Sequence, residues 1–145
     1  MLGEEQIAQV VAKVKVEPPR TLILVSHFPL LNEESVARTH GGKYAGHFQD
    51  GTKLLEELSE LVQNRIVIFS GHNHWHCITE EPLWIQCTTG GMIEYPIELR
   101  MVTLESNRMS HEVLGVASDE MIAESLAGAE WVRDTDKDRQ GELVL

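Results

Sequence analysis

Two short apolar runs, separated by an amphipathic segment, constrain the fold of this chain more than any other feature of its sequence. The runs are TLILV at 21–25 and RIVIFSG at 65–71. Continuous runs of β-branched and leucine residues are typical of parallel strands that are buried on both faces. The segments 4–16 and 50–64 show the spacing of amphipathic helices, the second with Asp50 or Thr52 as a candidate N-cap. Residues 4–71 therefore predict a helix–strand–helix–strand unit with parallel strands.

The chain after residue 76 has a different pattern. Short apolar segments at 76–81, 83–89, 97–105 and 108–117 are separated by turns and predict a mostly antiparallel β region. Residues 118–128 predict a short helix, 134–142 a charged turn, and 143–145 a last strand. We therefore expect an α/β fold in which an α/β unit is followed by a mostly antiparallel β region, all within one domain spanning residues 1–145.

Histidines follow both apolar runs. His27 comes after the first run in SHFPL, and His72 and His74 come after the second in SGHNHWH. Ligands of open α/β sheets bind beyond the carboxyl ends of the strands. Imidazole is the commonest metal ligand, and a His-x-His spacing lets two rings face one ion. A single histidine after a strand is usually an ordinary surface residue, but three at two matching strand ends predict a metal site.

The segments ILVSHFPL at 23–30 and IVIFSGHNHWH at 66–76 resemble the last two metal-binding motifs of the calcineurin-like metallophosphoesterases, in which a strand runs into histidine. The resemblance covers residues 4–104, with 105–145 as an extension. It implies part of a four-layer α/β/β/α sandwich with two divalent metal ions, which are Mn, Fe or Zn. His27 and His72 would bind one ion and His74 the other. The implied activity is hydrolysis of phosphomonoester or phosphodiester bonds by a metal-activated water.

The other half of that family's site has no counterpart in the sequence. The patterns D-x-H, G-D-x-x-D and G-N-H do not occur, and none of the five aspartates ends an apolar strand. We therefore expect this chain to be the C-terminal portion of such a domain and to be inactive alone. Half a sandwich leaves an unpaired sheet edge, so we expect a homo-oligomer or association with the missing N-terminal half.

Two alternatives to a phosphoesterase remain open. Three neutral imidazoles suffice to hold one zinc ion with water as the fourth ligand, which would make the chain a mononuclear zinc-binding module. A non-catalytic interaction domain that kept the fold and lost half of the site is the other alternative.

Four further residues are candidates for contact with a phosphoester substrate. His40, Lys43 and His47 lie in the loop at 34–51 that follows His27, where a solvated loop is the alternative. His76 follows Trp75 at the start of the next strand, where a structural role is the alternative. The sequence leaves the identity of the phosphoester open.

Charge and composition exclude several other classes of function. A formal net charge of −11 with no basic stripe argues against binding to a nucleic-acid backbone. No apolar run approaches the roughly 20 residues of a membrane span, and no signal-peptide pattern opens the chain, so we expect a cytoplasmic protein. Cys77 and Cys87 lack a CxxC spacing and are expected to be free, buried thiols.

Overall fold

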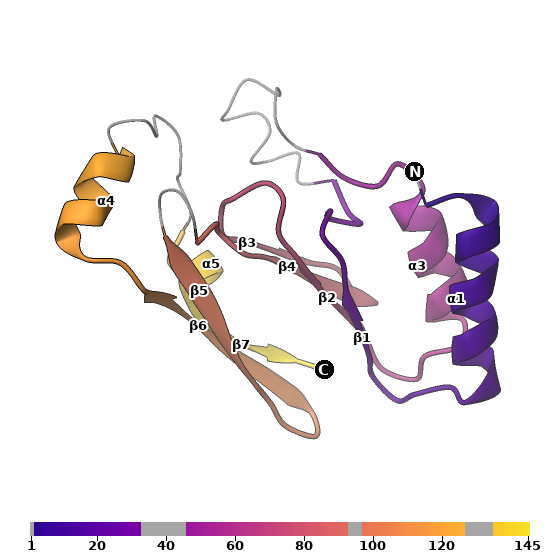
Figure 1. The fold of residues 1–145 in the computed structure, drawn as a ribbon. Coiled ribbons are helices and arrows are strands. Elements are labelled where there is room, and N and C mark those ends of the chain that lie inside the picture. Colours follow the sequence, from indigo (N-terminus) through magenta and orange to yellow (C-terminus); the bar gives the residue numbers. More distant parts are fainter. Residues whose placement is uncertain (1, 33–45, 93–96, 127–134) are drawn as a thin grey trace.

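The fold is mixed α/β, as predicted. A computed structural model describes residues 2–32, 46–92, 97–126 and 135–145. The helices are α1 (Glu4–Val16), α3 (Gly51–Ser59), α4 (Asp119–Leu126) and α5 (Asp136–Arg139). The strands are β1 (Leu22–Val25), β2 (Ile66–Ser70), β3 (Cys77–Glu80), β4 (Trp84–Thr88), β5 (Glu98–Leu104), β6 (Arg108–Gly115) and β7 (Gln140–Val144). Figure 1 shows how these elements are arranged.

The first sheet has four strands in the order β1-β2-β4-β3. β1 and β2 are parallel neighbours, with Leu22 opposite Ile66 and Val25 opposite Phe69, which confirms the predicted pairing. β4 is also parallel to β2, whereas β3 and β4 are antiparallel. The region after residue 76 is thus mostly antiparallel, as predicted, and the parallel pairing of β4 with β2 of the α/β unit was not predicted. The chain reverses twice after β2, at β3 and again at β4, so β4 regains the direction of β2 and pairs with it.

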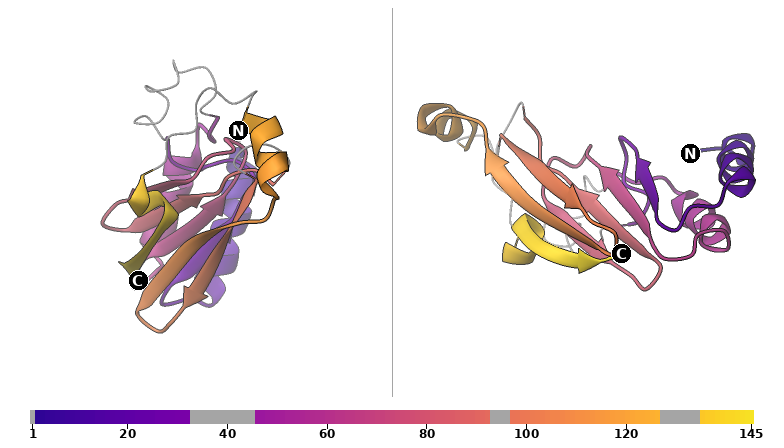
Figure 2. Two further views of the ribbon diagram at one scale, coloured as in Figure 1. Left: turned by 90° about the vertical axis from the view of Figure 1, so that its left-hand side faces the viewer. Right: turned by 90° about the horizontal axis from the view of Figure 1, so that it is seen from below.

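The second sheet is antiparallel throughout, in the order β5-β6-β7, as predicted for this half. It packs on one face of the first sheet, while α1 and α3 cover the other face (Figures 1 and 2). Consecutive residues of β2 serve both cores: Ile66 and Ile68 pack with the helices, and Val67 packs with Met109 of the second sheet. Burial of each such side chain contributes about 1.5–3 kcal/mol.

Helix α4 forms within the segment predicted for it, but it buries none of its residues. It lies beyond the second sheet, on the opposite side of the molecule from α1 (Figure 1). The layers seen in the described residues are therefore helices, the first sheet and the second sheet. The four-layer sandwich implied by the family resemblance stays a prediction.

The two apolar runs differ in their burial. β2 is buried along its length, apart from half-buried Phe69, as predicted. β1 is not buried on both faces, because Ile23 is 43% exposed and Val25 is 81% exposed. The prediction of double burial was wrong for β1. Leu22 and Leu24 face the helices, whereas Ile23 and Val25 point to the opposite face, where the core between the two sheets does not include them in the described residues.

The charged segment at 134–142 contains more regular structure than the predicted turn. Thr135 and Asp138 form a capping box on the single-turn helix α5, and β7 begins directly after it at Gln140. The Asp138 carboxylate also accepts the Ile78 N–H at 2.7 Å, which joins α5 to β3. Cys77 and Cys87 are free and buried, as predicted, and burial raises the pKa of the Cys87 thiol to about 12.

The start of α3 lies directly against the loop that follows β1. A Cβ on Gly51 would lie 2.2 Å from the Leu30 carbonyl oxygen, so only glycine fits at this position. Asp50 is the N-cap residue by position, but its side chain makes no cap hydrogen bond. Its carboxylate accepts the Leu2 and Gly3 N–H groups, which holds the start of the described chain on α3.

Candidate metal centre

The loops that follow β1 and β2 are joined by backbone hydrogen bonds. The Ser26 N–H donates to the Phe69 carbonyl at 3.0 Å, and the Gly71 N–H donates to the His27 carbonyl at 3.1 Å. Because the strands are parallel, both loops leave the same edge of the sheet. These bonds place His27 beside His72, as the sequence predicted from the matching strand ends.

The rings of His27 and His72 are in direct contact. His27 Nε2 lies 3.3 Å from His72 Nδ1, and the ring centroids are 5.1 Å apart. Two imidazole nitrogens bound to one tetrahedral zinc ion, each at about 2.0–2.1 Å, are separated by about 3.3 Å. The observed spacing therefore fits two ligands of one metal ion, and it also fits a hydrogen bond between one protonated and one unprotonated ring nitrogen.

Both histidines of the second loop have unusual backbone conformations. The φ angle is 63° at His72 and 58° at His74, in the left-handed region that residues with a side chain seldom occupy. Such a conformation costs about 1–3 kcal/mol and persists only where surrounding contacts enforce it. Strain of this kind is common at ligand-binding sites.

His72 is held by Phe28 and Gly46. The Phe28 ring centroid lies 3.8 Å from that of His72. Gly46 approaches the ring so closely that a Cβ there would lie 2.7 Å from His72 Nε2. The Gly46 N–H also donates to Asn73 Oδ1 at 3.2 Å. These contacts fix the ring with Nδ1 toward His27.

The surroundings of His72 favour its neutral form. Burial lowers the pKa of its imidazole, and the neighbouring charges of His27 and then His74 lower it further. A metal ligand must be an unprotonated imidazole, so a lowered pKa keeps His72 ready to bind a metal ion near neutral pH.

His74 lies beside the Gly90–Gly91 turn. A Cβ on Gly91 would lie 3.3 Å from His74 Cγ, so the imidazole rests against this glycine. The charge of His74 is one of the causes that lower the pKa of His72, so the two imidazoles lie near each other. Within the described ranges, no group of three or more His, Cys, Asp or Glu side chains is arranged to hold one metal ion. Metal binding by His74 stays a prediction.

The predicted substrate contacts fall in different places. His40 and Lys43 lie outside the residues that the structure describes. His47 is half-buried and follows Gly46, the residue that contacts His72. The Phe48 N–H donates to the Pro29 carbonyl at 2.9 Å, which returns this segment to the loop after β1. His47 is thus held close to the histidine pair, and its contact with substrate stays a prediction.

His76 is buried, with a side chain that is 0% exposed. Its Nε2 lies 3.1 Å from Glu98 Oε2, and its Nδ1 accepts the Gly90 N–H at 3.3 Å. It therefore lies between the end of β4 and the start of β5. Contact of His76 with substrate also stays a prediction.

Gln86, which was not predicted as part of the site, supports the loop that follows β1. Its side-chain oxygen accepts the N–H groups of Leu30 and Leu31, both at 2.8 Å, and its amide donates to the Leu31 carbonyl at 3.2 Å. Gln86 is fully buried and thereby fixes the loop that begins at His27. The signal available in the sequence was a polar residue in the middle of the apolar run at 83–88.

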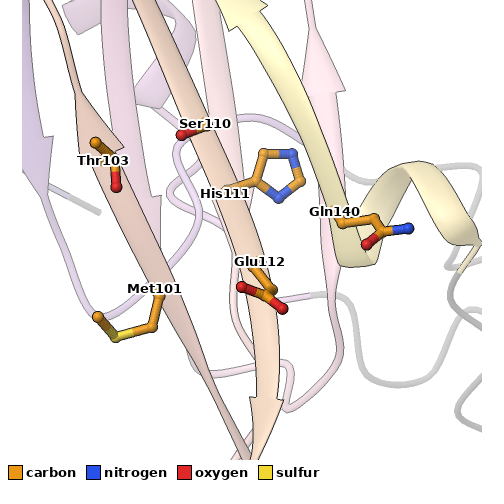
Figure 3. Close-up of a pocket in the computed structure, with 6 residues that line it drawn as sticks. All are labelled: Met101, Thr103, Ser110, His111, Glu112 and Gln140. Atoms are coloured by element: carbon orange, nitrogen blue, oxygen red, sulfur yellow. The ribbon is translucent and has the colours of Figure 1, made fainter.

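A shallow pocket of about 370 Å³ lies on the second sheet, away from the predicted ligands. Figure 3 shows its lining, which comes from β5, β6 and β7: Met101, Thr103, Ser110, His111, Glu112 and Gln140. Met101 is 55% exposed, which marks this pocket as an open surface feature. None of the predicted metal ligands lines it.

Comparisons of the chain with protein-family models, with curated proteins and with solved structures found no match. Among the described residues, every helix is too short or too polar to cross a lipid bilayer.

Proposed function

We propose that this chain provides the C-terminal half of the dinuclear centre of a metal-dependent phosphoesterase, which hydrolyses phosphomonoester or phosphodiester bonds. The observation that carries the proposal is the 3.3 Å separation of His27 Nε2 and His72 Nδ1 at the carboxyl ends of two neighbouring parallel strands. The separation fits two ligands of one ion, and the position is where α/β sheets bind ligands.

Each residue has a defined part in this proposal. His27 and His72 would hold one divalent ion, which is Mn, Fe or Zn, and His74 would hold the second. The ions would activate a water and neutralise the phosphoryl oxygens. Phe28 and Gly46 orient the ring of His72, and the loop residues His40, Lys43 and His47 would contact the substrate. A bound cation would also offset the repulsion between a phosphoester and a chain of net charge −11.

The remaining ligands would come from outside this chain. The family's bridging aspartate belongs to the N-terminal half of the domain, which would also complete the four-layer α/β/β/α sandwich. β1 ends the first sheet among the described residues, and such a strand edge favours pairing with another strand. The exposed Ile23 and Val25 add apolar surface on one face of β1, which a second chain would cover. We therefore expect the chain to form homo-oligomers or to bind its missing half, as measured by light scattering. A compact monomer would contradict this expectation.

The experiment that tests the function is metal stoichiometry by elemental analysis after reconstitution with Zn²⁺ or Mn²⁺. Two ions per chain, both lost in His27→Ala and His72→Ala but retained in His111→Gln, would support a dinuclear site. Hydrolysis of a chromogenic phosphate diester by that species would extend the result to activity.

The single alternative with structural support is a mononuclear zinc module, because the 3.3 Å spacing also fits one tetrahedral zinc ion. One ion per chain that is lost in His74→Ala as well as in His27→Ala would favour it, because only the mononuclear site binds a single ion through all three imidazoles. No bound metal would contradict both and leave the non-catalytic interaction domain.

A further inference from the structure

A buried polar cluster joins the two sheets at the edge that carries the candidate metal site. His76 precedes β3, and Glu98, which begins β5, faces it with a side chain that is 13% exposed. The His76 Nε2 to Glu98 Oε2 distance is 3.1 Å. Arg139 of α5 donates to the other oxygen of Glu98, so the carboxylate is held from two sides.

The partners of His76 determine its tautomer. Its Nδ1 accepts the Gly90 N–H at 3.3 Å, and the Arg100 guanidinium approaches the same atom at 3.5 Å. Because both partners are donors, Nδ1 carries no proton, and the proton on Nε2 is donated to Glu98. The imidazole is thereby fixed in one orientation by partners on both of its nitrogens.

This cluster determines the position of the Gly90–Gly91 turn. His76 holds the Gly90 N–H, and the Glu98 N–H donates to the Gly91 carbonyl at 3.3 Å. The Thr89 N–H donates to the Ser70 carbonyl at 2.9 Å, so the segment is bound from the first sheet as well. The turn is thus held by hydrogen bonds from both sheets, and the imidazole of His74 rests on it at Gly91.

The backbone of His74 makes such a surface necessary. Its φ of 58° is disfavoured for a residue with a side chain and needs surrounding contacts to hold it. If the backbone of His74 relaxed toward ordinary φ angles, its ring would move away from the proposed metal site.

We propose that buried His76, oriented by Glu98, positions His74 by accepting the Gly90 N–H and so fixing the Gly90–Gly91 turn against which the His74 imidazole rests. The inference rests on the proposed function, since it assumes that His74 binds metal. His76 and Glu98 act through the turn and touch no reacting group, so they are positioning residues. The proposal gives His76 a role other than substrate contact.

Two substitutions of His76 separate its two hydrogen bonds. In His76→Asn the amide oxygen takes the place of Nδ1 and keeps the bond from Gly90. In His76→Gln the amide nitrogen takes the place of Nε2 and keeps the bond to Glu98. Both changes remove one buried hydrogen bond and lower the melting temperature, but only His76→Gln releases the turn.

The test is Zn²⁺ affinity, measured by competition with a chromophoric chelator, together with the visible absorption spectrum of the Co²⁺-substituted protein. We expect His76→Gln to weaken Zn²⁺ binding by about 10- to 100-fold, as is typical when an outer partner of a metal ligand is lost. Its Co²⁺ spectrum should change, while His76→Asn should keep the wild-type spectrum. A wild-type affinity and spectrum in His76→Gln, despite a lower melting temperature, would overturn the inference.

The same measurements distinguish failure of the inference from failure of the proposed function. Wild-type protein that binds neither Zn²⁺ nor Co²⁺ would contradict the function itself, and the inference with it. If the His76 variants do not fold, Gly91→Ala tests the same turn, because the added Cβ would press on His74 at 3.3 Å. A changed Co²⁺ spectrum in Gly91→Ala would support the inference, and an unchanged one would overturn it.

Discussion

Two pairs of histidines in this molecule have opposite environments. His27 and His72 lie at the ends of parallel strands, where their ring nitrogens face each other among aromatic rings and glycines. His76 and His111 lie between the sheets, where Arg100 contacts the Nδ1 of both, at 3.5 and 2.7 Å. The ring nitrogens of the first pair are placed so that they could bind a metal ion. Those of the second pair already contact the charged side chains of Arg100 and Glu98. Position in the fold, and not residue type, therefore distinguishes the proposed metal ligands from the buried histidines between the sheets.

The largest effect should come from removing a ligand of the first pair. His72→Ala should weaken Zn²⁺ binding by more than about 100-fold, beyond the loss typical of an outer partner. The matched change His111→Gln should leave Zn²⁺ affinity within about threefold, because His111 belongs to the second sheet. Isothermal titration of both variants measures the contrast. Equal losses of affinity would remove the distinction between the two pairs.

A smaller effect on the same pair should follow from crowding His72. The Cβ of Gly46→Ala would lie 2.7 Å from His72 Nε2, so the ring must shift away from His27. We expect Zn²⁺ affinity to fall by about tenfold, comparable to the loss of an outer partner. Gly115→Ala is the control, because a Cβ there meets no atom within 4 Å. Chelator competition that gave the same affinity for both variants would show that Gly46 does not orient His72.

Stability should show the reverse contrast between the two pairs. His111→Ala removes a buried partner of Arg100 and should lower the free energy of unfolding by about 1–3 kcal/mol. His27→Ala alters an exposed side chain and should change that free energy by less than about 0.5 kcal/mol in the metal-free protein. Urea denaturation of the two variants gives both values. A greater loss in His27→Ala would reverse the assignment of structural and binding roles.

The smallest effect should be a pH dependence that originates in the second pair. Burial and then the charge of Arg100 lower the pKa of His111, while Asp138 opposes the shift. Because the unfolded chain takes up this proton more readily, stability is complete above about pH 6.5 and falls as pH drops below it. The midpoint of urea denaturation should therefore fall less steeply with acid in His111→Gln than in wild type. An identical slope would show that His111 does not contribute.

The sequence allowed the α/β unit and its site to be predicted more fully than the second half of the chain. The strand assignments of TLILV and RIVIFSG follow from local composition, and the pairing of His27 with His72 follows from parallel neighbours ending at one edge. The exposure of Val25 was missed, because the extent of the core between the two sheets depends on how they pack, which residue patterns do not encode. The partners of His76 were missed for a related reason. Glu98 and Arg100 reach it only through the packing of two sheets.

Gly51 illustrates how a position can be intolerant of substitution for reasons unrelated to chemistry. The Leu30 carbonyl leaves no room for any side chain there, so variants selected for folding alone should retain glycine. His72 has no such steric requirement, and selection for folding should allow other residues there. A library selected first for folding and then for metal binding would therefore keep Gly51 in both rounds, and would begin to keep His72 only in the second.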